Sequence, residues 1–242
     1  MQIYSKTDVG KMRHTNQDAY ASFELDVSTV FAIVCDGMGG ANAGNVASEN
    51  AVKIICEYVK RSYRKNMDVI GISSLLKSAV ISANIELYDM ALKNPDLSGM
   101  GTTVVAAVVR ENSAVICHAG DSRAYLISGD SIAQLTTDHS MVQSLVESGK
   151  LTPEQAKVHP RKNVITRALG AEENIVTDCC DINMVKGDTL LLCSDGLTNY
   201  VDIKDILKTV KNNNISDVAQ ILTSTANSNG GGDNITVVTV TA

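Results

Sequence analysis

The sequence predicts an α+β fold in which helices cover β-sheets, and three observations support this prediction. Short apolar runs rich in β-branched residues occur near the start, in the middle and at the end of the 242 residues. Segments with apolar residues at helical spacing separate these runs. The turns between the middle runs are too short for parallel crossovers, which indicates antiparallel pairing. With 44% hydrophobic residues, the chain can bury a sizeable core.

The first half contains two apolar runs, 30–35 and 102–109, that are typical of buried strands. Two helices are expected between them, each with one apolar stripe. The first stripe comprises Val46, Ala47, Ala51, Ile54, Ile55 and Tyr58, and the second comprises Leu76, Val80, Ala83, Leu87 and Ala91. Asn94-Pro95 should end the second helix. Because each helix has one polar face, each should cover a sheet.

The second half is rich in strands. Predicted strands are 104–109, 114–118, 123–127, 131–135, 175–182, 189–193 and a last run at 235–240. Predicted helices lie near 203–211 and 216–226. Residues 136–174 interrupt the pattern with a short helix after Ser140 and a capping box at Thr152-Pro153-Glu154-Gln155. This segment is locally basic, through Lys157, Arg161, Lys162 and Arg167.

Composition and charge exclude several classes of function. The net charge of −6 argues against nucleic acid as a partner. The chain has no polybasic patch and no signal-peptide layout at its N-terminus. No apolar stretch approaches the ~20 residues needed to span a bilayer. We therefore expect a cytoplasmic chain with no membrane partner.

The six cysteines (35, 56, 117, 179, 180 and 193) lack C-x-x-C spacing, and four of them lie in apolar runs. Buried free thiols in a reducing cytoplasm are the favoured interpretation, and disulfides or zinc ligation are the alternatives. The adjacent pair Cys179-Cys180 leaves a redox site open.

Carboxylates follow several of the predicted strands. Apolar runs end at Asp36-Gly37 and at Asp195-Gly196, and Asp233 directly precedes the last run. An Asp-Gly pair alone is most often a turn in which glycine supplies positive φ. The recurrence at strand ends, with Asp18 and Asp121 as further members, favours a shared site, because a buried carboxylate needs a compensating charge.

Two divalent cations would outweigh Asp36, Asp195 and Asp233 by one positive charge, which suits an anionic substrate. The candidate ligands are all oxygen, which favours Mg²⁺ or Mn²⁺ over Zn²⁺ or Cu²⁺. A cation pair about 3.5–4 Å apart is a known arrangement for phosphoester hydrolysis.

Seven short motifs, in this order, resemble those of the metal-dependent protein phosphatases of the type 2C (PPM) family, in its compact bacterial form. They are Arg13-x-x-Asn16-x-Asp18, Asp36-Gly37-Met38-Gly39-Gly40, Ala43-Gly44, Gly101-Thr102-Thr103, Gly120-Asp121-Ser122-Arg123, Ser194-Asp195-Gly196 and Gly232-Asp233-Asn234-Ile235-Thr236. The resemblance implies one catalytic domain over 1–242 with a four-layer α-β-β-α sandwich. Residues 136–174 correspond to the family's flap and are called the flap segment below.

The resemblance also implies roles for individual residues. Asp36 would bridge two ions, Asp195 and Asp233 would complete the first, and the carbonyl of Gly37 would bind the second. Asp18 would act through water, Asp121 would hold a weaker third ion, Arg13 would bind the phosphate, and Asn234 would orient its neighbours. The implied reaction is direct attack on phosphoserine or phosphothreonine by a water that bridges the two ions, with no phospho-enzyme.

One position departs from several eukaryotic members, which carry a histidine where this chain has Met38. Methionine cannot donate a proton, so acid catalysis is expected from a metal-bound water, with His14 as the alternative. In the flap segment Arg161, Lys162 or Arg167 would meet acidic substrate segments, against the alternative of an ordinary solvated loop. His139 and His159 should have hydrogen-bonding or packing roles, and His118 should be a satisfied interior histidine.

The resulting hypothesis is a monomeric, cytoplasmic protein serine/threonine phosphatase that opposes a bacterial Ser/Thr kinase and acts on its phosphorylated substrates. Two alternatives remain open. One is a catalytically silent phosphoprotein-binding module, which the presence of Asp36, Gly37, Asp195 and Asp233 disfavours. The other is a different two-metal phosphoesterase, which the acidic surface and the lack of a basic groove with aromatic residues disfavour.

Overall fold

Two antiparallel sheets packed face to face form the centre of the computed structural model, which describes residues 1–40 and 43–242. One sheet has the order β1-β11-β10-β7-β8, and the other has the order β2-β3-β5-β6-β9 with β4 paired to β3. The strands are β1 (Gln2–Asp8), β2 (Asp18–Asp26), β3 (Thr29–Met38), β4 (Gly101–Thr102), β5 (Val104–Arg110), β6 (Ser113–Ala119), β7 (Arg123–Ser128), β8 (Ser131–Gln134), β9 (Asp178–Asn183), β10 (Thr189–Cys193) and β11 (Ile235–Thr241).

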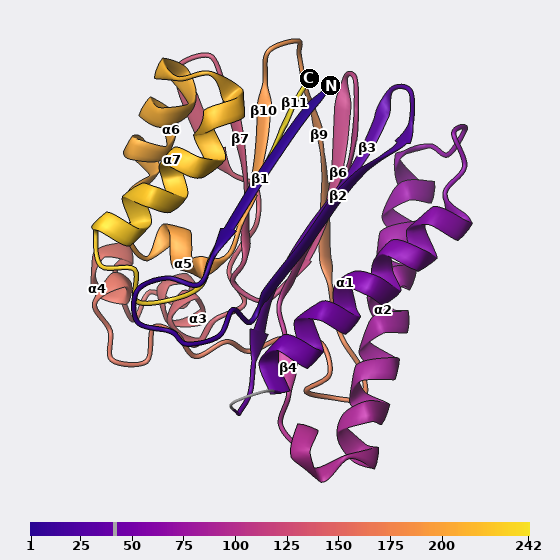
Figure 1. Ribbon diagram of the computed structural model, residues 1–242, viewed down its shortest axis with the longest axis vertical. Coiled ribbons are helices and arrows are strands. Elements are labelled where there is room, and N and C mark those ends of the chain that lie inside the picture. The colour runs from indigo at the N-terminus through magenta and orange to yellow at the C-terminus, as the bar shows by residue number, and fades with distance from the viewer. Residues whose placement is uncertain (41–42) are drawn as a thin grey trace.

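A pair of helices covers the outer face of each sheet, so the four-layer α+β sandwich is confirmed (Figure 1). Helices α1 (Ala43–Ser62) and α2 (Val69–Lys93) cover the sheet that contains β3, and α6 (Ile203–Asn212) and α7 (Ile215–Ser228) cover the sheet that contains β10. The short helices are η1 (Pro95–Leu97), α3 (Met141–Glu147), α4 (Pro153–Lys157) and α5 (Asp195–Thr198). Elements α3, α4, α5 and β4 lie toward the end opposite the two chain termini (Figure 1).

Three apolar clusters separate the four layers. Phe31, Ile55 and Leu76 belong to the cluster between α1, α2 and their sheet. A second cluster fills the space between the two sheets, and a third lies under α6 and α7. Alternate residues of the central strands point to opposite faces, as Phe31 and Ala32 do, so these strands are buried on both sides and are apolar throughout.

The capping residues of three helices confirm the predicted helix ends. Asn94 is the C-cap of α2, and its backbone N–H donates to the Met90 carbonyl. Thr152 and Gln155 form the expected capping box of α4. Ser140 caps α3 through a hydrogen bond from the Gln143 backbone N–H. Because these signals depend on residues within one turn of each other, they could be recognised without tertiary information.

Other boundaries differ from the predictions. The run 102–109 is divided between two strands. Thr102, in β4, pairs with Gly37 of β3, whereas Val104, in β5, pairs with Ala119 of β6. Strand β9 begins at Asp178 rather than at 175, because Asp178 is the first residue of this segment that pairs with β6. Strands β1 and β2 were not singled out in the sequence, because most of their residues are only half-buried and their polarity is mixed.

Helix α2 corrects the expectation that no segment is long enough to span a bilayer. By length and composition alone, Val69–Lys93 could cross a membrane. In the structure its apolar side packs against α1 and strands β5, β6 and β9, with Leu76 and Leu87 fully buried. The apolar character of α2 is therefore explained by its place in the outer helical layer.

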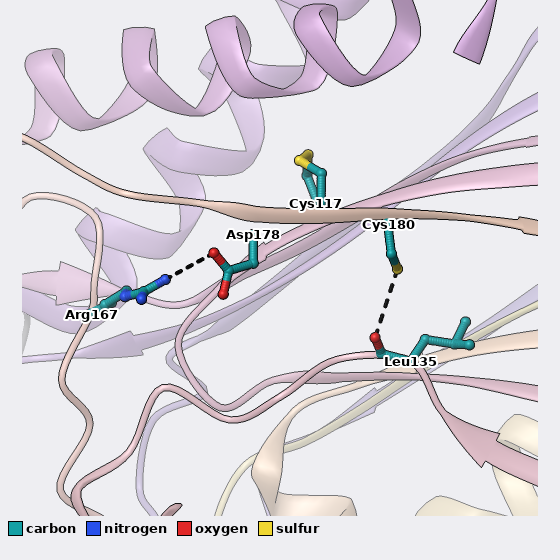
Figure 2. Close-up of a disulfide and its surroundings, with 6 residues drawn as sticks. Cys117, Leu135, Arg167, Asp178 and Cys180 are labelled. Atoms are coloured by element: carbon teal, nitrogen blue, oxygen red, sulfur yellow. Dashed lines mark hydrogen bonds and ion pairs between the residues drawn. A yellow bond between two sulfur atoms is a disulfide. The ribbon is translucent and has the colours of Figure 1, made fainter. Parts of the chain in front are cut away.

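A disulfide between Cys117 and Cys179 corrects the expectation of six free thiols (Figure 2). The two residues are direct partners in the register of β6 and β9, with Cα atoms 4.2 Å apart. Their separation of 62 residues hides this proximity in the sequence. The remaining four cysteines are free, and Cys180 points to the opposite side of β9, where its thiol contacts the Leu135 carbonyl at 3.7 Å (Figure 2).

Candidate metal centre and active site

Four of the five predicted carboxylates line one cavity of about 230 Å³, together with Arg13, Gly37 and Asn234. The four are Asp36, Asp121, Asp195 and Asp233. They come from β3, the loop after β6, the start of α5 and the loop before β11. The fifth, Asp18, is buried opposite Asp36 in the register of β2 and β3. The fold therefore brings together residues that are up to 215 positions apart in the sequence.

The backbone around Asp36 is fixed by the Gly101-Thr102-Thr103 segment. The Asp36 N–H donates to Thr103 Oγ1 at 2.9 Å, and the Asp36 carbonyl accepts from the Thr103 N–H and from Thr102 Oγ1, each at 2.9 Å. Thr103 Oγ1 is also bonded to Ser122 Oγ at 2.7 Å, next to Asp121. The two threonines thus connect the end of β3, which carries Asp36, to the loop that carries Asp121.

Glycine is required at positions 37 and 196 by close approach of backbone. A Cβ on Gly37 would lie 2.0 Å from the Gly44 carbonyl oxygen, and one on Gly196 would lie 1.9 Å from that of Asn234. Neither residue has positive φ, so the turn interpretation is wrong for both. The space left by the missing side chains lets the first turn of α1 pack against Gly37 and lets the Asn234 backbone pack against α5.

Asp18 and Asp195 each keep one buried oxygen without a hydrogen-bond partner. Asp18 Oδ2 accepts from Ser194 Oγ at 2.7 Å and from Thr236 Oγ1 at 2.6 Å, which leaves Oδ1 unpaired. Asp195 Oδ2 accepts from Asn199 Nδ2 at 2.9 Å, which again leaves Oδ1 unpaired. Unpaired buried oxygens are costly, and a bound cation would compensate them.

Burial is the main cause of abnormal pKa values at the site. It raises the pKa of Asp36 well above its ordinary value, and it raises those of Asp18 to about 7, Asp195 to about 6 and Asp121 to about 8. Repulsion among the carboxylates adds to the shift in each case. Without a cation, the centre therefore retains protons at neutral pH.

Arg13 is the basic residue at this cavity and is bound to Asp233. Its Nη2 donates to Asp233 Oδ2 at 3.0 Å, which raises the pKa of Arg13. Half of the Arg13 side chain is exposed, so the guanidinium retains free donors toward solvent. The ion pair holds this side chain at the mouth of the carboxylate cavity.

Asn234 holds the loop that carries Arg13. Its Nδ2 donates to the Val9 carbonyl at 2.9 Å and to the Thr15 carbonyl at 3.0 Å, and its Oδ1 accepts from the Gln17 N–H at 2.8 Å. These three bonds satisfy most of the hydrogen-bonding capacity of a buried amide. The predicted orienting role of Asn234 therefore has a concrete form, which is attachment of residues 9–17 to the start of β11.

The residues present fit a pair of hard divalent cations. All candidate donors are oxygens, two of them buried and unpaired, and the carboxylates outnumber the guanidinium. This donor set matches Mg²⁺ or Mn²⁺. Among the described residues a histidine-containing group with metal-ligand spacing also occurs, formed by His118, His139 and Asp178, but it lies outside this cavity.

The group formed by His139, Asp178 and Arg167 anchors the flap segment, and sequence analysis missed it. His139 Nδ1 accepts from the Gly120 N–H at 3.1 Å, so Nε2 carries the proton and donates to Asp178 Oδ2 at 2.9 Å. Arg167 Nη1 lies 3.2 Å from Asp178 Oδ1 (Figure 2). With these contacts made, and with His118 Nε2 bonded to the Thr137 carbonyl, the group is a structural network rather than a cation site.

Two residues considered for a role in the sequence lie apart from the centre. His14 and Arg161 are exposed and do not line the carboxylate cavity, whereas Met38 does. Arg123, which was not singled out for a role, forms a two-pronged ion pair with Asp138, with Nε–Oδ1 at 2.8 Å and Nη2–Oδ2 at 2.6 Å. This pair ties the start of β7 to the start of the flap segment.

Comparison with known proteins agrees with this geometry. The family model for protein phosphatase 2C matches residues 11–230. The chain belongs to the protein phosphatase 2C family. It is 42% identical over 238 residues to the serine/threonine phosphatase stp of Listeria innocua, covering 97% of this chain and 93% of that protein. It is 37% identical over 243 residues to protein phosphatase PhpP of Streptococcus pneumoniae, covering 99% of this chain and 97% of that protein.

Solved structures show the same fold as this phosphatase 2C chain. The serine/threonine phosphatase Stp1 of Staphylococcus aureus superposes with a TM-score of 0.93 at 35% identity, covering 100% of this chain and 94% of that chain. The catalytic domain of the phosphatase PstP, solved in complex with two manganese ions, gives a TM-score of 0.83 at 30% identity, covering 98% and 96% of the two chains.

Proposed function

We propose that this chain hydrolyses phosphoserine and phosphothreonine in other proteins and uses Mn²⁺ or Mg²⁺ as its cofactor. The observation that supports this most directly is the convergence of four carboxylates and one guanidinium on a single cavity in a member of the protein phosphatase 2C family. Bound divalent cations would supply Lewis-acid activation of water and charge neutralisation at the phosphate.

The individual ligand roles in this proposal are those that the resemblance to the family implies. Asp36 would contact both ions, and Asp195 and Asp233 would complete the first of them. The carbonyl of Gly37 would contribute to the second. Asp18 lies behind Asp36 and outside the cavity lining, which supports a role through water. Asp121 lines the same cavity and is the candidate for a third ion.

The chain's own groups bind and orient the substrate. Arg13 stands at the mouth of the cavity with free guanidinium donors, and two parallel donors suit a phosphate. Asn234 keeps the Arg13 loop in place. Because Met38 has no proton to donate and His14 lies outside the cavity, water is the source of the proton for the leaving alkoxide.

The finer biological assignments belong to the same proposal. The whole of 1–242 would act as one catalytic domain with the flap segment as an insertion. The chain would work as a monomer in the cytoplasm, on a Ser/Thr kinase and the proteins that this kinase phosphorylates. The four free cysteines are typical of a reducing compartment, whereas the Cys117–Cys179 disulfide is not. A contact between Arg161 and substrate stays a prediction.

Hydrolysis of a phosphothreonine peptide and of p-nitrophenyl phosphate tests the proposal. Both should be hydrolysed with Mn²⁺ or Mg²⁺, and activity should disappear with EDTA and return with added metal. Activity that persists after thorough metal removal would contradict it. Cleavage of a bis-phosphodiester alone would favour a two-metal phosphodiesterase, and phosphopeptide binding without turnover would favour a silent binding module.

A further inference from the structure

A second cavity of about 360 Å³ lies beside the carboxylate cavity and is called the flap groove here. Its lining includes apolar side chains, among them Ala171 and Val176, that come from the end of the flap segment and the loop before β9. Val176 is 63% exposed, so its side chain is accessible to a molecule that enters this cavity. Of the substrate contacts expected from the sequence, only that of Arg167 falls at this cavity.

The flap groove is adjacent to the carboxylate cavity. Met38 and Ile165 line both cavities, so these two side chains form the shared wall. Met38 lies against Gly101, where an added Cβ would be 2.8 Å from the methionine Cε. Met38 has no acid–base role, and its side chain instead forms one edge of this groove.

The charges around the flap groove do not favour an acidic ligand. Arg167 lines the groove, but its guanidinium is 3.2 Å from Asp178 and 3.0 Å from His139 Nε2, so its charge is balanced within the chain. Glu172 also lines the groove and is exposed. The sequence had predicted that Arg167 meets acidic substrate segments; its contacts here argue against that role.

We propose that the flap groove binds an aliphatic side chain of the phosphoprotein substrate, two residues from the phosphorylated serine or threonine. Side chains two apart in an extended chain point to the same face, about 7 Å from each other. A phosphorylated side chain in the carboxylate cavity would thus place its second neighbour on the same side, across the wall formed by Met38 and Ile165. This inference rests on the proposed phosphatase function.

Four phosphothreonine peptides of equal net charge test the groove. They carry leucine or asparagine at the second residue before or the second residue after phosphothreonine. With Mn²⁺ present, kcat/KM should be about tenfold higher for leucine than for asparagine on at least one side, as is usual for an apolar pocket. The small substrate p-nitrophenyl phosphate, which reaches only the carboxylate cavity, provides the reference rate.

Two valines with the same 63% exposure give a matched pair of variants. Val176→Asn should reduce the leucine preference to about twofold, because a neutral polar group replaces an apolar contact. Val185→Asn, in the loop between β9 and β10, should retain the preference. Ala171→Trp should fill the groove and lower kcat/KM for the leucine peptide. All three should hydrolyse p-nitrophenyl phosphate at the wild-type rate and melt at the wild-type temperature.

The outcomes distinguish the groove from the phosphatase function itself. Equal kcat/KM for all four peptides, alongside normal turnover of p-nitrophenyl phosphate, would contradict side-chain binding in the flap groove and leave the proposed phosphatase function intact. An equal loss of peptide and p-nitrophenyl phosphate hydrolysis in Val176→Asn would also overturn it. A wild-type chain that hydrolyses neither kind of substrate with Mn²⁺ would contradict the proposed function and the groove with it.

Discussion

Asp18 and Asp36 lie directly opposite each other on the neighbouring strands β2 and β3. Asp18 is buried and Asp36 is half-buried, and two facing carboxylates are unfavourable in the absence of a positive charge. Ser194 and Thr236 hydroxyls bind one oxygen of Asp18 and thereby hold it on the side of the metal centre away from the cavity. The pair explains why the chain should depend on cations for stability as well as for turnover.

The metal-free chain should lose stability as pH rises from about 5 to 8. Asp195, Asp18 and Asp121 have folded-state pKa values of about 6, 7 and 8, above the ordinary carboxyl value of 3.8. A carboxyl whose pKa is raised by folding contributes stability below pH 4, and this contribution is lost as pH rises through the folded value. Thermal melts in EDTA at pH 5, 6, 7 and 8 measure the effect.

Added Mn²⁺ should reverse this trend, because protons and cations compete for the same oxygens. The increase in melting temperature caused by Mn²⁺ should therefore be larger at pH 8 than at pH 5. Sodium chloride at equal ionic strength is the control for general screening. A melting temperature that is independent of both pH and Mn²⁺ would show that these carboxylates do not form a cation site.

Much of this carboxylate cluster could be predicted from sequence because most of its members adjoin a recognisable strand. Asp36 and Asp195 each terminate an apolar run, and the order of the short motifs supplied the rest. The reason for Gly196 could not be predicted. It depends on the approach of the Asn234 carbonyl, which is 38 residues away in the sequence and comes close only when α5 meets the start of β11.

Contacts that depend on sheet register were also out of reach. His139 and Asp178 are 39 residues apart, and Cys117 and Cys179 are 62 apart. Both relationships require β6 to pair with β9, and these strands are separated by β7, β8 and the whole flap segment. A pattern of apolar residues predicts that two strands exist, but it does not say which residues face each other across them.

Asp36→Asn should abolish activity and stabilise the metal-free chain. The amide removes a half-buried carboxyl whose pKa is raised well above its ordinary value, mainly by desolvation, so the free energy of unfolding in EDTA should increase by about 1–2 kcal/mol at pH 8. The variant should show little phosphatase activity and a weakened response to Mn²⁺. Urea unfolding and peptide turnover measure the two effects. Asp96→Asn, at an exposed position in η1, is the control and should change neither.

Arg13→Ala should lower kcat/KM for phosphopeptides about 10- to 100-fold, the amount expected for one lost charge-assisted contact. Arg13→Lys should restore part of this, since lysine keeps the charge but not the paired donors. Stability should change by less than about 1 kcal/mol, because the Arg13–Asp233 pair is partly exposed. Lys11→Ala on the same loop is the control, and an equal loss of activity there would remove the specific role of Arg13.

His139 offers a test of the flap anchor by two isosteric replacements. Asparagine can keep an acceptor near the position of Nδ1 and so retain the bond from the buried Gly120 N–H, whereas glutamine extends toward the position of Nε2. His139→Gln should therefore destabilise the chain by about 1–3 kcal/mol, the cost of an unpaired buried N–H. His139→Asn should cost less, because the Asp178 side chain is half exposed and can be solvated. Equal urea midpoints for the two variants would argue against this account.

Reduction of the Cys117–Cys179 disulfide should destabilise the chain without changing its fold. The crosslink spans 62 residues, and a loop of this size corresponds to a loss of about 2–4 kcal/mol in the free energy of unfolding when it is opened. Chemical denaturation with and without a reductant measures the difference, and the double variant Cys117→Ser/Cys179→Ser should be insensitive to it. Alkylation of the unreduced, denatured protein should modify only the four free cysteines, 35, 56, 180 and 193. Six modified thiols in protein taken directly from cells would show that the two facing cysteines remain reduced there, and the predicted stability difference would then apply only to oxidised protein.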